Sequence, residues 1–419
     1  MHVVIVGGGF GGLAAARALR RARVRITLID RQNYHLFQPL LYQVAGAVLS
    51  PADIAAPIRS ILRRQRNVAV RLATVAHIDL AAKEVILADF ERVAYDRLIV
   101  AAGARSHYFG HDEWRAIAPT LKTLEDAVAI RQRVLLAFEK AEWAARDAER
   151  RRLLTFVVIG GGPTGVELAG TLVELAKHTL QRDFRNIDSR TARVLLIEAG
   201  PTVLPGLPPR LQERALRDLR DLGVEVMLGK PVESITANTV VVGGDAIEAG
   251  TILWAAGVKP VPLAEAFGVP LDRGRVVVEP DLSIPGHPEV AVVGDLACFR
   301  GDDGKPLPGV APVAIQMGRH AARNVERALA GQPPLPFRYH DRGTLATIGR
   351  RRAVAWIGRW QFTGFVAWVV WLFVHLLAIV GFRSRLVVLL EWAWSYFTFQ
   401  RGSRLIRRER SDHTPAGAL

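Results

Sequence analysis

Three glycines near the start of the chain, Gly7, Gly9 and Gly12, have the spacing G-x-G-x-x-G. In a loop between a strand and a helix, the first glycine permits a tight turn, the second lets the backbone approach a pyrophosphate, and the third lets the helix pack closely on the strand. The N-terminus of that helix also offers free N–H groups to phosphates. Asp30, 18 residues after Gly12, can accept a hydrogen bond from a ribose. We therefore predict that this segment binds a dinucleotide.

A second loop, Gly160, Gly162 and Gly165, repeats the same spacing. The acid that ends the next strand-like run is Glu198, 33 residues after Gly165, because a long helical run and a polar loop at 182–192 come between them. A carboxylate at this position accepts a hydrogen bond from a 2′-hydroxyl and repels a 2′-phosphate. The second segment is therefore expected to prefer NADH over NADPH.

The runs around both loops supply the elements that must position them. Strand-like runs at 3–6 and 156–159 precede the glycines, helical runs follow, and further strand-like runs at 25–29 and 193–197 lead to the two acids. We predict an α/β protein with two doubly wound, Rossmann-type dinucleotide-binding domains. Two such domains indicate two nucleotides, and a flavin with a nicotinamide is the economical pair because hydride passes readily between them. The alternative is a duplicated fold in which one site no longer binds.

Composition excludes several other classes of protein. The chain has 419 residues and a single cysteine, Cys298. One cysteine excludes an intramolecular disulfide, a cysteine-based zinc site, a Cys-ligated iron–sulfur cluster and an internal redox cysteine pair, and we expect no metal site. The net charge of +15 favours an anionic partner. Met1 leads directly into a strand-like run and not into an apolar signal sequence, so the bulk of the protein is expected in the cytosol.

Three further stretches resemble parts of flavoproteins that bind two dinucleotides. YDRLIVAAGAR (95–105) resembles the strand-and-glycine segment that closes the FAD domain, and ILWAAGVKP (252–260) resembles its counterpart in the NADH domain. AVVGDLA (291–297) is similar to the late motif whose aspartate binds the ribityl chain of FAD. The resemblance implies cofactor contacts at Gly103, Gly257 and Asp295.

NYHLFQPLLYQVA (33–45), PGVAPVAIQMGRHAARNV (308–325) and the aromatic C-terminal region narrow the resemblance to type II NADH:quinone oxidoreductases, which are single-chain NADH dehydrogenases that do not pump protons. This resemblance implies FAD and NADH as cofactors and a membrane quinone as the electron acceptor. Hydride would pass from NADH to the flavin, and two electrons would then pass to the quinone.

The same resemblance points to two catalytic residues, Glu167 and Gln316. The quinone-side motif of the family reads approximately A-Q-x-A-x-Q; here Ala311, Ala314 and Gln316 match it, and Pro312 replaces the first glutamine. Proline removes a side-chain amide and a backbone donor, which leaves the polar contact to Gln316. Glu167 matches a glutamate that supports hydride or proton handling near the flavin. We expect it in the first turn of a helix, where the helix dipole stabilises a negative charge.

The C-terminal region has the composition of a membrane-attached segment. Residues 360–382 contain no Asp, Glu, Lys or Arg, and as a helix would be about 35 Å long, enough to cross a bilayer. However, tryptophans are spread through this run, and the next apolar run, 386–399, is short and contains Glu391. We therefore favour helices that lie in one leaflet.

Arginines flank these apolar runs and are predicted to bind anionic headgroups. They are Arg350, Arg351, Arg352, Arg359, Arg383, Arg385, Arg401, Arg404, Arg407, Arg408 and Arg410. We find no nucleic-acid motif and expect no nucleic-acid partner. The predicted location is the cytoplasmic side of the cell membrane, with peripheral or monotopic attachment, and whether two copies form a homodimer is left open.

The predicted domain order places the NADH domain inside the FAD domain. Residues 1–115 and 270–345 form the FAD-binding domain, 116–269 the NADH-binding domain and 346–419 the membrane-associated region. A helix over 124–151 is expected to mark the crossing between domains, and the C-terminal region is expected to dock on the FAD domain.

Other functions remain compatible with the sequence. One is a soluble NADH-dependent reductase of a ferredoxin-like protein, and another is a membrane-bound NADH-sensing flavoprotein with little turnover. A sulfide:quinone oxidoreductase shares the architecture but needs a cysteine pair that this chain lacks.

Overall fold

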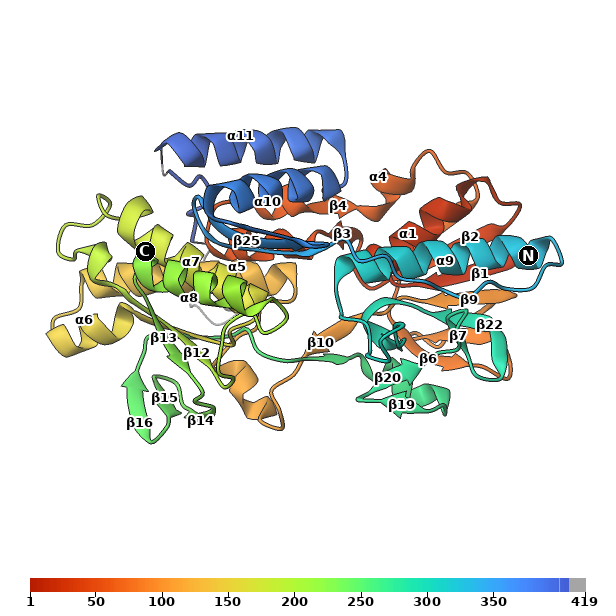
Figure 1. Cartoon of the computed structure of the whole chain (residues 1–419), viewed down its shortest axis with the longest axis horizontal. Helices are drawn as coiled ribbons and strands as arrows, with labels where there is room; N and C mark the ends of the chain where they lie inside the picture. Colours follow the sequence, from red (N-terminus) through yellow and green to blue (C-terminus); the bar gives the residue numbers. More distant parts are fainter. Residues whose placement is uncertain (399, 407–419) are drawn as a thin grey trace, which may run out of the picture. The chain divides into compact units, whose positions relative to one another are not determined.

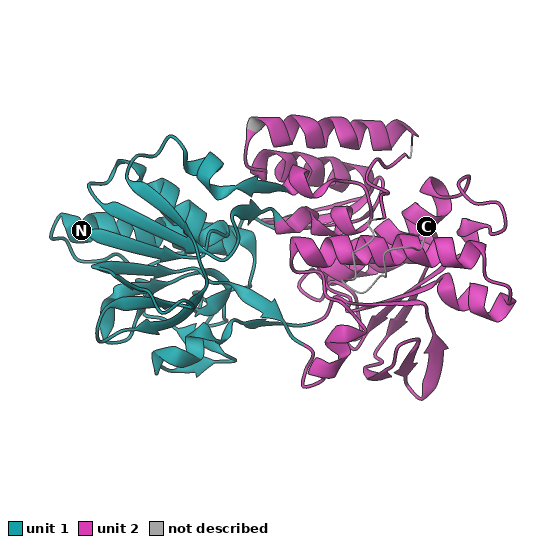
Figure 2. Ribbon diagram, turned by 180° about the vertical axis from the view of Figure 1, so that it is seen from behind, with its two compact units in different colours: residues 1–37, 55–107, 257–343 teal, residues 38–54, 108–256, 344–419 magenta. Residues whose placement is uncertain are grey.

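The computed structural model describes residues 1–398 and 400–406. Its strands and helices follow the chain as Figure 1 labels them. The chain divides into two compact units, which Figure 2 colours separately: unit 1 comprises 1–37, 55–107 and 257–343, and unit 2 comprises 38–54, 108–256 and 344–419.

Unit 1 is built on a six-stranded sheet in the order β21-β22-β9-β1-β2-β5. All neighbours pair in parallel except β21, which is antiparallel to β22. The strands of this sheet are β1 (His2–Val6), β2 (Arg25–Asp30), β5 (Val68–Leu72), β9 (Arg97–Val100), β21 (Ser283–Ile284) and β22 (His287–Val292). Four of the five residues of β1 are buried, as expected for a central strand covered on both faces.

Two helices of unit 1 pack against each other through glycine. Helix α1 (Phe10–Ala18) follows the first loop, and α9 (Ala311–Leu329) crosses it. A Cβ atom at Gly318 of α9 would lie 2.1 Å from the carbonyl oxygen of Gly11, so only glycine permits this approach. The remaining elements are β3 (Tyr34–Leu36), β4 (Ala55–Pro57), α4 (Ile58–Leu62), β6 (Val75–Asp79), β7 (Glu84–Leu87), β8 (Arg92–Ala94), β10 (Ala104–Ser106), β18 (Val258–Pro260), β19 (Leu271–Asp272), β20 (Arg275–Val277) and β23 (Ala297–Cys298).

Unit 2 contains a second, four-stranded parallel sheet in the order β13-β12-β11-β17. Its strands are β11 (Thr155–Ile159), β12 (Arg193–Glu198), β13 (Val224–Leu228) and β17 (Thr251–Trp254). Helix α7 (Pro163–Glu174) follows the second glycine loop, and α8 (Pro209–Leu222) precedes β13. The antiparallel strands β14 (Val232–Ile235), β15 (Thr239–Val242) and β16 (Asp245–Glu248) and the short helices α2 (Leu41–Ala45) and α3 (Pro51–Ile54) complete this part.

The predicted helix over 124–151 is two helices, so that prediction is wrong in its extent. Helix α5 (Leu124–Glu142) begins with a capping box in which Thr123 and Asp126 exchange hydrogen bonds, and α6 (Asp147–Leu153) begins after a break. The carboxylate of Glu142 accepts hydrogen bonds from the backbone N–H groups of residues 185–187. The end of α5 therefore serves as an anchor for that loop.

The C-terminal region packs on unit 2, both on α7 of the predicted NADH domain and on residues 41–54, which belong to the predicted FAD domain. Strands β24 (Thr344–Gly349), β25 (Arg352–Ile357) and β26 (Trp360–Thr363) form an antiparallel sheet, followed by α10 (Gly364–Ala378) and α11 (Phe382–Thr398). Strand β24 lies against α7, where a Cβ atom at Gly170 would be only 1.8 Å from the carbonyl oxygen of Ile348. Helix α10 packs on β25 through small side chains, Ala367 against Ala353 and Ala355.

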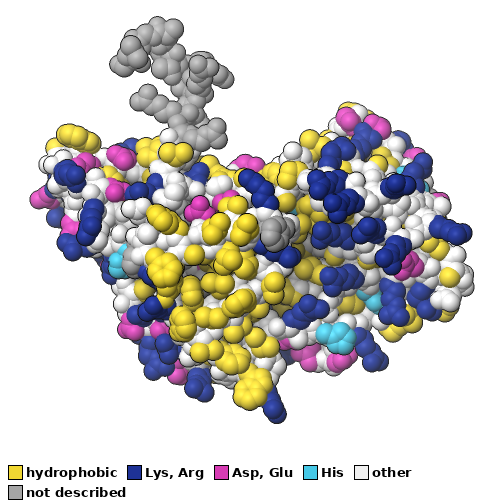
Figure 3. All heavy atoms as spheres, turned by 90° about the horizontal axis from the view of Figure 1, so that it is seen from above, with side chains coloured by type: hydrophobic (Ala, Val, Ile, Leu, Met, Phe, Trp, Pro, Cys, Tyr) yellow, Lys and Arg dark blue, Asp and Glu magenta, His cyan; other side chains and the backbone are white. Residues whose placement is uncertain are grey.

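The uncharged run 360–382 therefore does not form one long helix. Its first four residues pair with β25 as β26, and α10 ends at Ala378. No helix within residues 1–398 or 400–406 has both the length and the apolar character that crossing a bilayer requires. Helices α10 and α11 nevertheless expose large apolar side chains, including Phe373, Leu377, Trp394 and Phe397, and Figure 3 shows an extensive apolar area over them.

The contact between Gly170 and Ile348 gives a test of how the C-terminal sheet is seated. We expect Gly170→Ala to lower the free energy of unfolding by about 3 kcal/mol, because the added methyl group collides with a backbone oxygen. Alanine favours a helix over glycine by about 1 kcal/mol, so without a collision the variant would be more stable. A net loss of stability can therefore be assigned to the collision. Gly206→Ala is the matched control, since no atom lies within 4 Å of its Cβ position. If urea unfolding shows equal stability for the two variants, β24 does not pack closely on Gly170.

Candidate functional site

The two glycine loops have the same internal geometry in their separate units. Gly7 and Gly160, the first glycines, have φ angles of 100° and 115°, a region that favours glycine. A Cβ atom on the third glycine, at Gly12 or Gly165, would lie 1.8 Å from the carbonyl oxygen of the first. The second glycines, Gly9 and Gly162, have no atom within 4 Å of their Cβ positions. Each loop therefore leaves open space at the point where a pyrophosphate would approach the N-terminus of the helix.

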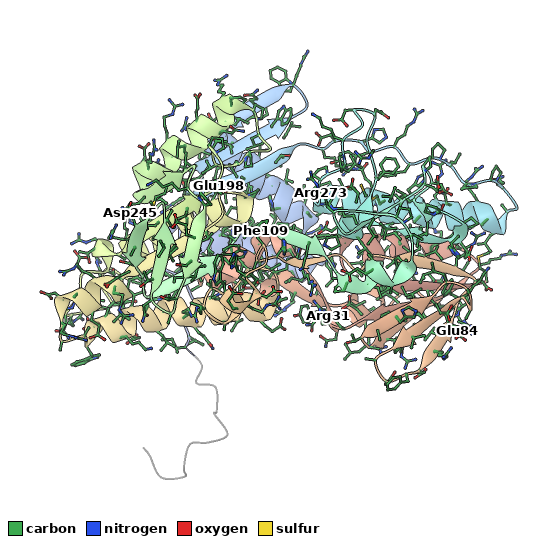
Figure 4. All side chains as sticks on the ribbon, turned by 90° about the horizontal axis from the view of Figure 1, so that it is seen from below. Arg31, Glu84, Phe109, Glu198, Asp245 and Arg273 are labelled. Carbon is green, nitrogen blue, oxygen red and sulfur yellow. The ribbon has the colours of Figure 1, made fainter. Side chains whose placement is uncertain are left out.

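The two acids close their loops in the same way. The carboxylate of Asp30 accepts hydrogen bonds from Gly8 N at 2.5 Å and Gln32 N at 2.7 Å. In unit 2, the carboxylate of Glu198 accepts from Gly161 N at 2.5 Å and Gly200 N at 2.7 Å. Glu198 is thus unusually far from its glycines in sequence, but in space it contacts its loop as Asp30 does. Figure 4 labels Glu198 at the end of the unit 2 strands.

The other predicted cofactor residues follow neighbouring strands at the same edges of the two sheets. In unit 1, Gly103 comes after β9 and the half-buried Asp295 after β22, both on the side of β1 away from β2. Gly257 comes three residues after the end of β17 and is the first residue of the last segment of unit 1. Because the carboxyl ends of parallel strands meet at one edge, Gly7, Asp30, Gly103 and Asp295 gather at one edge of their sheet. Gly160 and Glu198 gather likewise in unit 2. The residues present fit a dinucleotide in each unit.

Glu167 lies on α7 but not where the sequence placed it. The helix has no acidic residue in its first turn, so the predicted stabilisation of a negative charge by the dipole does not apply. Its carboxylate accepts one long hydrogen bond, 3.4 Å from Thr347 N of β24. Burial raises the pKa of Glu167 well above the ordinary glutamate value, and this hydrogen bond opposes the shift only in part. Glu167 is therefore a carboxyl group that holds its proton where an exposed glutamate would have lost it.

Gln316 lies on α9 of unit 1, and both ends of its amide bind backbone. Its Nε2 donates to the carbonyl oxygen of His340 at 2.9 Å, and its Oε1 accepts from His340 N at 3.0 Å. In this arrangement the amide fixes the segment that follows α9. A quinone contact at Gln316 stays a prediction, and it would use the second N–H or the second lone pair of this amide.

Sequence reasoning missed a buried chain of polar groups on α2. Trp392 of α11 donates from Nε1 to Gln43 Oε1 at 2.7 Å, and Gln43 Nε2 donates to Tyr42 Oη at 3.0 Å. Burial raises the pKa of Tyr42, and the nearby charge of Glu167 raises it further. Tyr42 and Gln43 stand within the FQPLLYQVA stretch that carried the family resemblance, so that motif could have directed attention to them.

A buried cation also joins the C-terminal segment to this region. Only 6% of Arg401 is exposed, and its guanidinium donates to the carbonyl oxygens of Gly46 at 2.7 Å and Thr171 at 3.2 Å. It pairs with Glu174 at 3.4 Å, and Glu174 also accepts from Arg350 N at 2.5 Å. The predicted role of Arg401 as a headgroup ligand is therefore wrong.

Several other C-terminal arginines also bind protein groups. The guanidinium of Arg350 lies 4.2 Å from the ring centre of Tyr396, and Arg351 donates to the hydroxyl of the same tyrosine. Arg352 pairs with Asp218 and Asp221, and Arg404 with Asp183. Arg385 donates to the carbonyl oxygen of Ile379. The predicted lipid ligands Arg407, Arg408 and Arg410 lie outside the described residues.

A groove of about 1230 Å³ runs along unit 2 between α5, α11 and residues 400–406. Carboxylates such as Glu139 and Glu391 line it together with the apolar side chains of Trp394 and Leu405. None of the residues predicted from the sequence to contact a cofactor or quinone lies in this groove.

Comparisons with known proteins agree with this description. Residues 1–318 match the pyridine nucleotide-disulphide oxidoreductase family, and residues 341–401 match the NDH2 C-terminal domain. The chain is 47% identical to the type II NADH:quinone oxidoreductase Ndh of Mycobacterium tuberculosis, over 98% of this chain and 91% of the relative. It is 31% identical to the type II NADH:quinone oxidoreductase of Staphylococcus haemolyticus, over 86% of this chain and 91% of that protein.

The fold is also that of a solved structure, NDH2 from Plasmodium falciparum in complex with NADH. The TM-score is 0.88 at 18% identity, covering 97% of this chain and 99% of the other. With two matching glycine loops, a family match over three quarters of the sequence and relatives aligned along nearly its whole length, the chain belongs to the pyridine nucleotide-disulphide oxidoreductases and, among these, to the type II NADH:quinone oxidoreductase family.

Proposed function

We propose that this chain oxidises NADH through bound FAD and reduces a membrane quinone by two electrons, without pumping protons. The observation that carries the proposal is the repeated geometry of the glycine loops, each closed by the carboxylate that ends the second strand. Two nucleotide sites of this kind in one chain suit a pair of redox coenzymes. When bound, the flavin supplies the hydride acceptor and the two-electron donor.

We assign the two nucleotides to separate units. In unit 1 the loop Gly7, Gly9 and Gly12 would hold the pyrophosphate of FAD and Asp30 its ribose, with Gly103 and Asp295 at the same edge. In unit 2 the loop Gly160, Gly162 and Gly165 would hold NADH, with Glu198 on the adenosine ribose; Gly257, which follows β17 in sequence, stays the predicted further contact. The predicted FAD domain, 1–115 with 270–345, and the predicted NADH domain, 116–269, stay proposals, and their bounds differ from those of the units in that 38–54 and 108–115 belong to unit 2 and 257–269 to unit 1.

Quinone reduction consumes two protons as well as two electrons, and Glu167 is the residue we assign to proton supply. Its raised pKa keeps a proton available. When Glu167 does ionise, its negative charge raises the pKa of the nearby Tyr42. Gln43 holds the Tyr42 hydroxyl, and Trp392 holds Gln43, so a residue of the C-terminal helices fixes the position of this tyrosine. Gln316 remains the proposed polar contact to the quinone.

The exposed apolar side chains of α10 and α11 suit monotopic attachment to the cytoplasmic side of the cell membrane. Helices with such faces lie in the plane of the interface with their apolar side among the acyl chains. This surface would give the chain access to a lipid-soluble quinone. Anionic lipid is part of the proposed environment.

The activity is tested by preparing the full chain from membranes and recording its absorption spectrum. We expect a yellow protein whose flavin band is bleached by NADH, and steady NADH oxidation only when a short-chain quinone is added. Rapid bleaching with negligible turnover on quinone would instead identify an NADH sensor. Turnover with a ferredoxin-like protein and none with quinone would identify a soluble-type reductase.

Replacing each of the two matched acids, Glu198 and Asp30, by its amide tests which unit binds which nucleotide. Glu198→Gln should weaken the preference for NADH over NADPH by about tenfold in kcat/KM, because the group that repels a 2′-phosphate is neutralised. The control is Asp30→Asn, which should reduce FAD retention and leave the coenzyme preference of the flavin-loaded fraction unchanged. If the NADH to NADPH ratio stays constant in Glu198→Gln, the placement of the ribose-binding acid is wrong.

The proton held by Glu167 should be visible in both stability and rate. The folded chain keeps this proton where the unfolded chain has lost it, so its contribution to stability falls as the pH rises above the ordinary value of 4.5. Glu167→Gln should therefore gain in thermal midpoint relative to the unmodified chain between pH 5 and pH 8. Quinone reduction should slow by about a hundredfold, as for loss of a general acid. Parallel stability curves for the two proteins would argue against a raised pKa.

A further inference from the structure

The positive charge of the chain is concentrated at its N-terminal end. Residues 1–78 contain 11 arginines, no lysine and only two acids, Asp30 and Asp53, which gives a net charge of 11 − 2 = +9 out of +15. Both acids are engaged locally, Asp30 in its glycine loop and Asp53 with Ser50 N. No aspartate or glutamate occurs at 8–29 or 54–78. Any negative charge that neutralises the arginines of these two segments must therefore come from outside the segments.

The fold brings the two arginine-rich segments together on unit 1. The buried amide of Gln65 donates to the carbonyl oxygen of Ala16 at 2.8 Å. Asn67 Nδ2 donates to the carbonyl oxygens of Leu19 at 2.9 Å and Ala22 at 3.1 Å. These bonds join the turn after α4 to the end of α1. We name the exposed side chains around this junction the arginine face: Arg20, Arg21, Arg23, Arg59, Arg63, Arg64 and Arg66.

Within the part of the chain that the structure describes, no carboxylate neutralises the arginine face. Among the described residues, none of its seven members forms an ion pair, whereas many C-terminal arginines do. Helix α9, which packs on α1, brings a single acid, Glu326, together with further arginines. Figure 3 shows basic side chains gathered on the face of unit 1 that carries α1 and α4. Like charges held together in this way repel one another until an anionic surface neutralises them.

The arginine face, except for Arg59, lies away from the dinucleotide loop of unit 1; Arg59 follows Ile58, whose side chain lies against Gly8. Helix α1 starts at the carboxyl ends of the strands and runs back, so its last residues lie near the amino ends of β2 and β5, which begin at Arg25 and Val68. The glycine loop and Asp30 lie at the opposite edge of the sheet. The partner of the arginine face is thus a second anionic ligand, separate from FAD.

We propose that the arginine face binds the anionic phospholipid headgroups of the bilayer to which the C-terminal helices attach. This inference rests on the proposed membrane attachment. It assigns the electrostatic attraction to anionic lipid to unit 1 in place of the C-terminal arginines. The runs RRARVR (20–25) and RSILRRQRN (59–67) contain no aromatic side chain on which nucleic-acid bases could stack. The exposed apolar surface of α10 and α11 supplies an independent reason to expect a lipid surface.

The test compares binding of the full chain to vesicles of phosphatidylcholine alone and of phosphatidylcholine with phosphatidylglycerol. The test variant is Arg21→Gln/Arg63→Gln/Arg64→Gln. The control is Arg210→Gln/Arg217→Gln/Arg220→Gln, which removes three exposed arginines from α8. Flavin content and NADH oxidation with a water-soluble acceptor should be equal in all three proteins, which shows that the variants are folded.

At low ionic strength, the unmodified chain and the control should bind the anionic vesicles more tightly than the neutral ones. The test variant should lose about fivefold in affinity for each arginine removed, on the order of a hundredfold in total, on anionic vesicles only. High salt should abolish the difference.

Four other results would overturn the inference, and they separate it from the proposed function. Equal loss in the test and control variants means that only net charge matters and no dedicated face exists. Equal binding of the unmodified chain to both vesicle types refutes the arginine face but retains apolar attachment. No binding to either type refutes both proposals. Loss of duplex DNA binding without loss of vesicle binding would reassign the face to nucleic acid.

Discussion

The close approach of each nucleotide-binding helix to the strand before it is the constraint on which the two sites depend. At Gly12 and Gly165 the space for a side chain is already occupied by the carbonyl oxygen of the first glycine in the same loop. A larger residue would displace the helix N-terminus and open the loop. The acid from the neighbouring strand would then lose the N–H group that it accepts from. Phosphate binding and ribose selection thus share one packing contact.

Close contacts at glycine also position the elements that pack on the two nucleotide-binding helices. Gly318 lets α9 cross α1, and Gly170 lets the C-terminal sheet lie on α7. Because α7 starts at the second glycine loop and also carries Thr171 and Glu174, the helix that would receive NADH phosphates also holds Arg401. The C-terminal sheet therefore lies directly on the nucleotide-binding helix, and α10 packs in turn on that sheet.

The loops, their strands and both acids could be predicted because each signal is local in sequence. The parallel register of β11 and β12 places Glu198 just as that of β1 and β2 places Asp30, and its contact with a ribose stays a prediction. The C-terminal region could not be predicted in this way. Its apolar run gives no sign that residues 360–363 pair with β25. The partners of Trp392 and Arg401, Gln43 and Glu174, are 349 and 227 residues away, and no periodicity within one segment records such contacts.

The arginines show why composition can predict a class of partner and still misplace it. Hydropathy directs attention to the basic residues beside apolar runs, but carboxylates and aromatic rings of unit 2 lie within reach of several of them. The seven residues of the arginine face stand in segments without acids, and folding brings them together without an ion pair to any described carboxylate. A burial-driven contact is insensitive to salt, whereas a charge contact is screened by it. Separating the two on different units would allow apolar insertion to hold the chain on a membrane while lipid charge adjusts how firmly unit 1 is held.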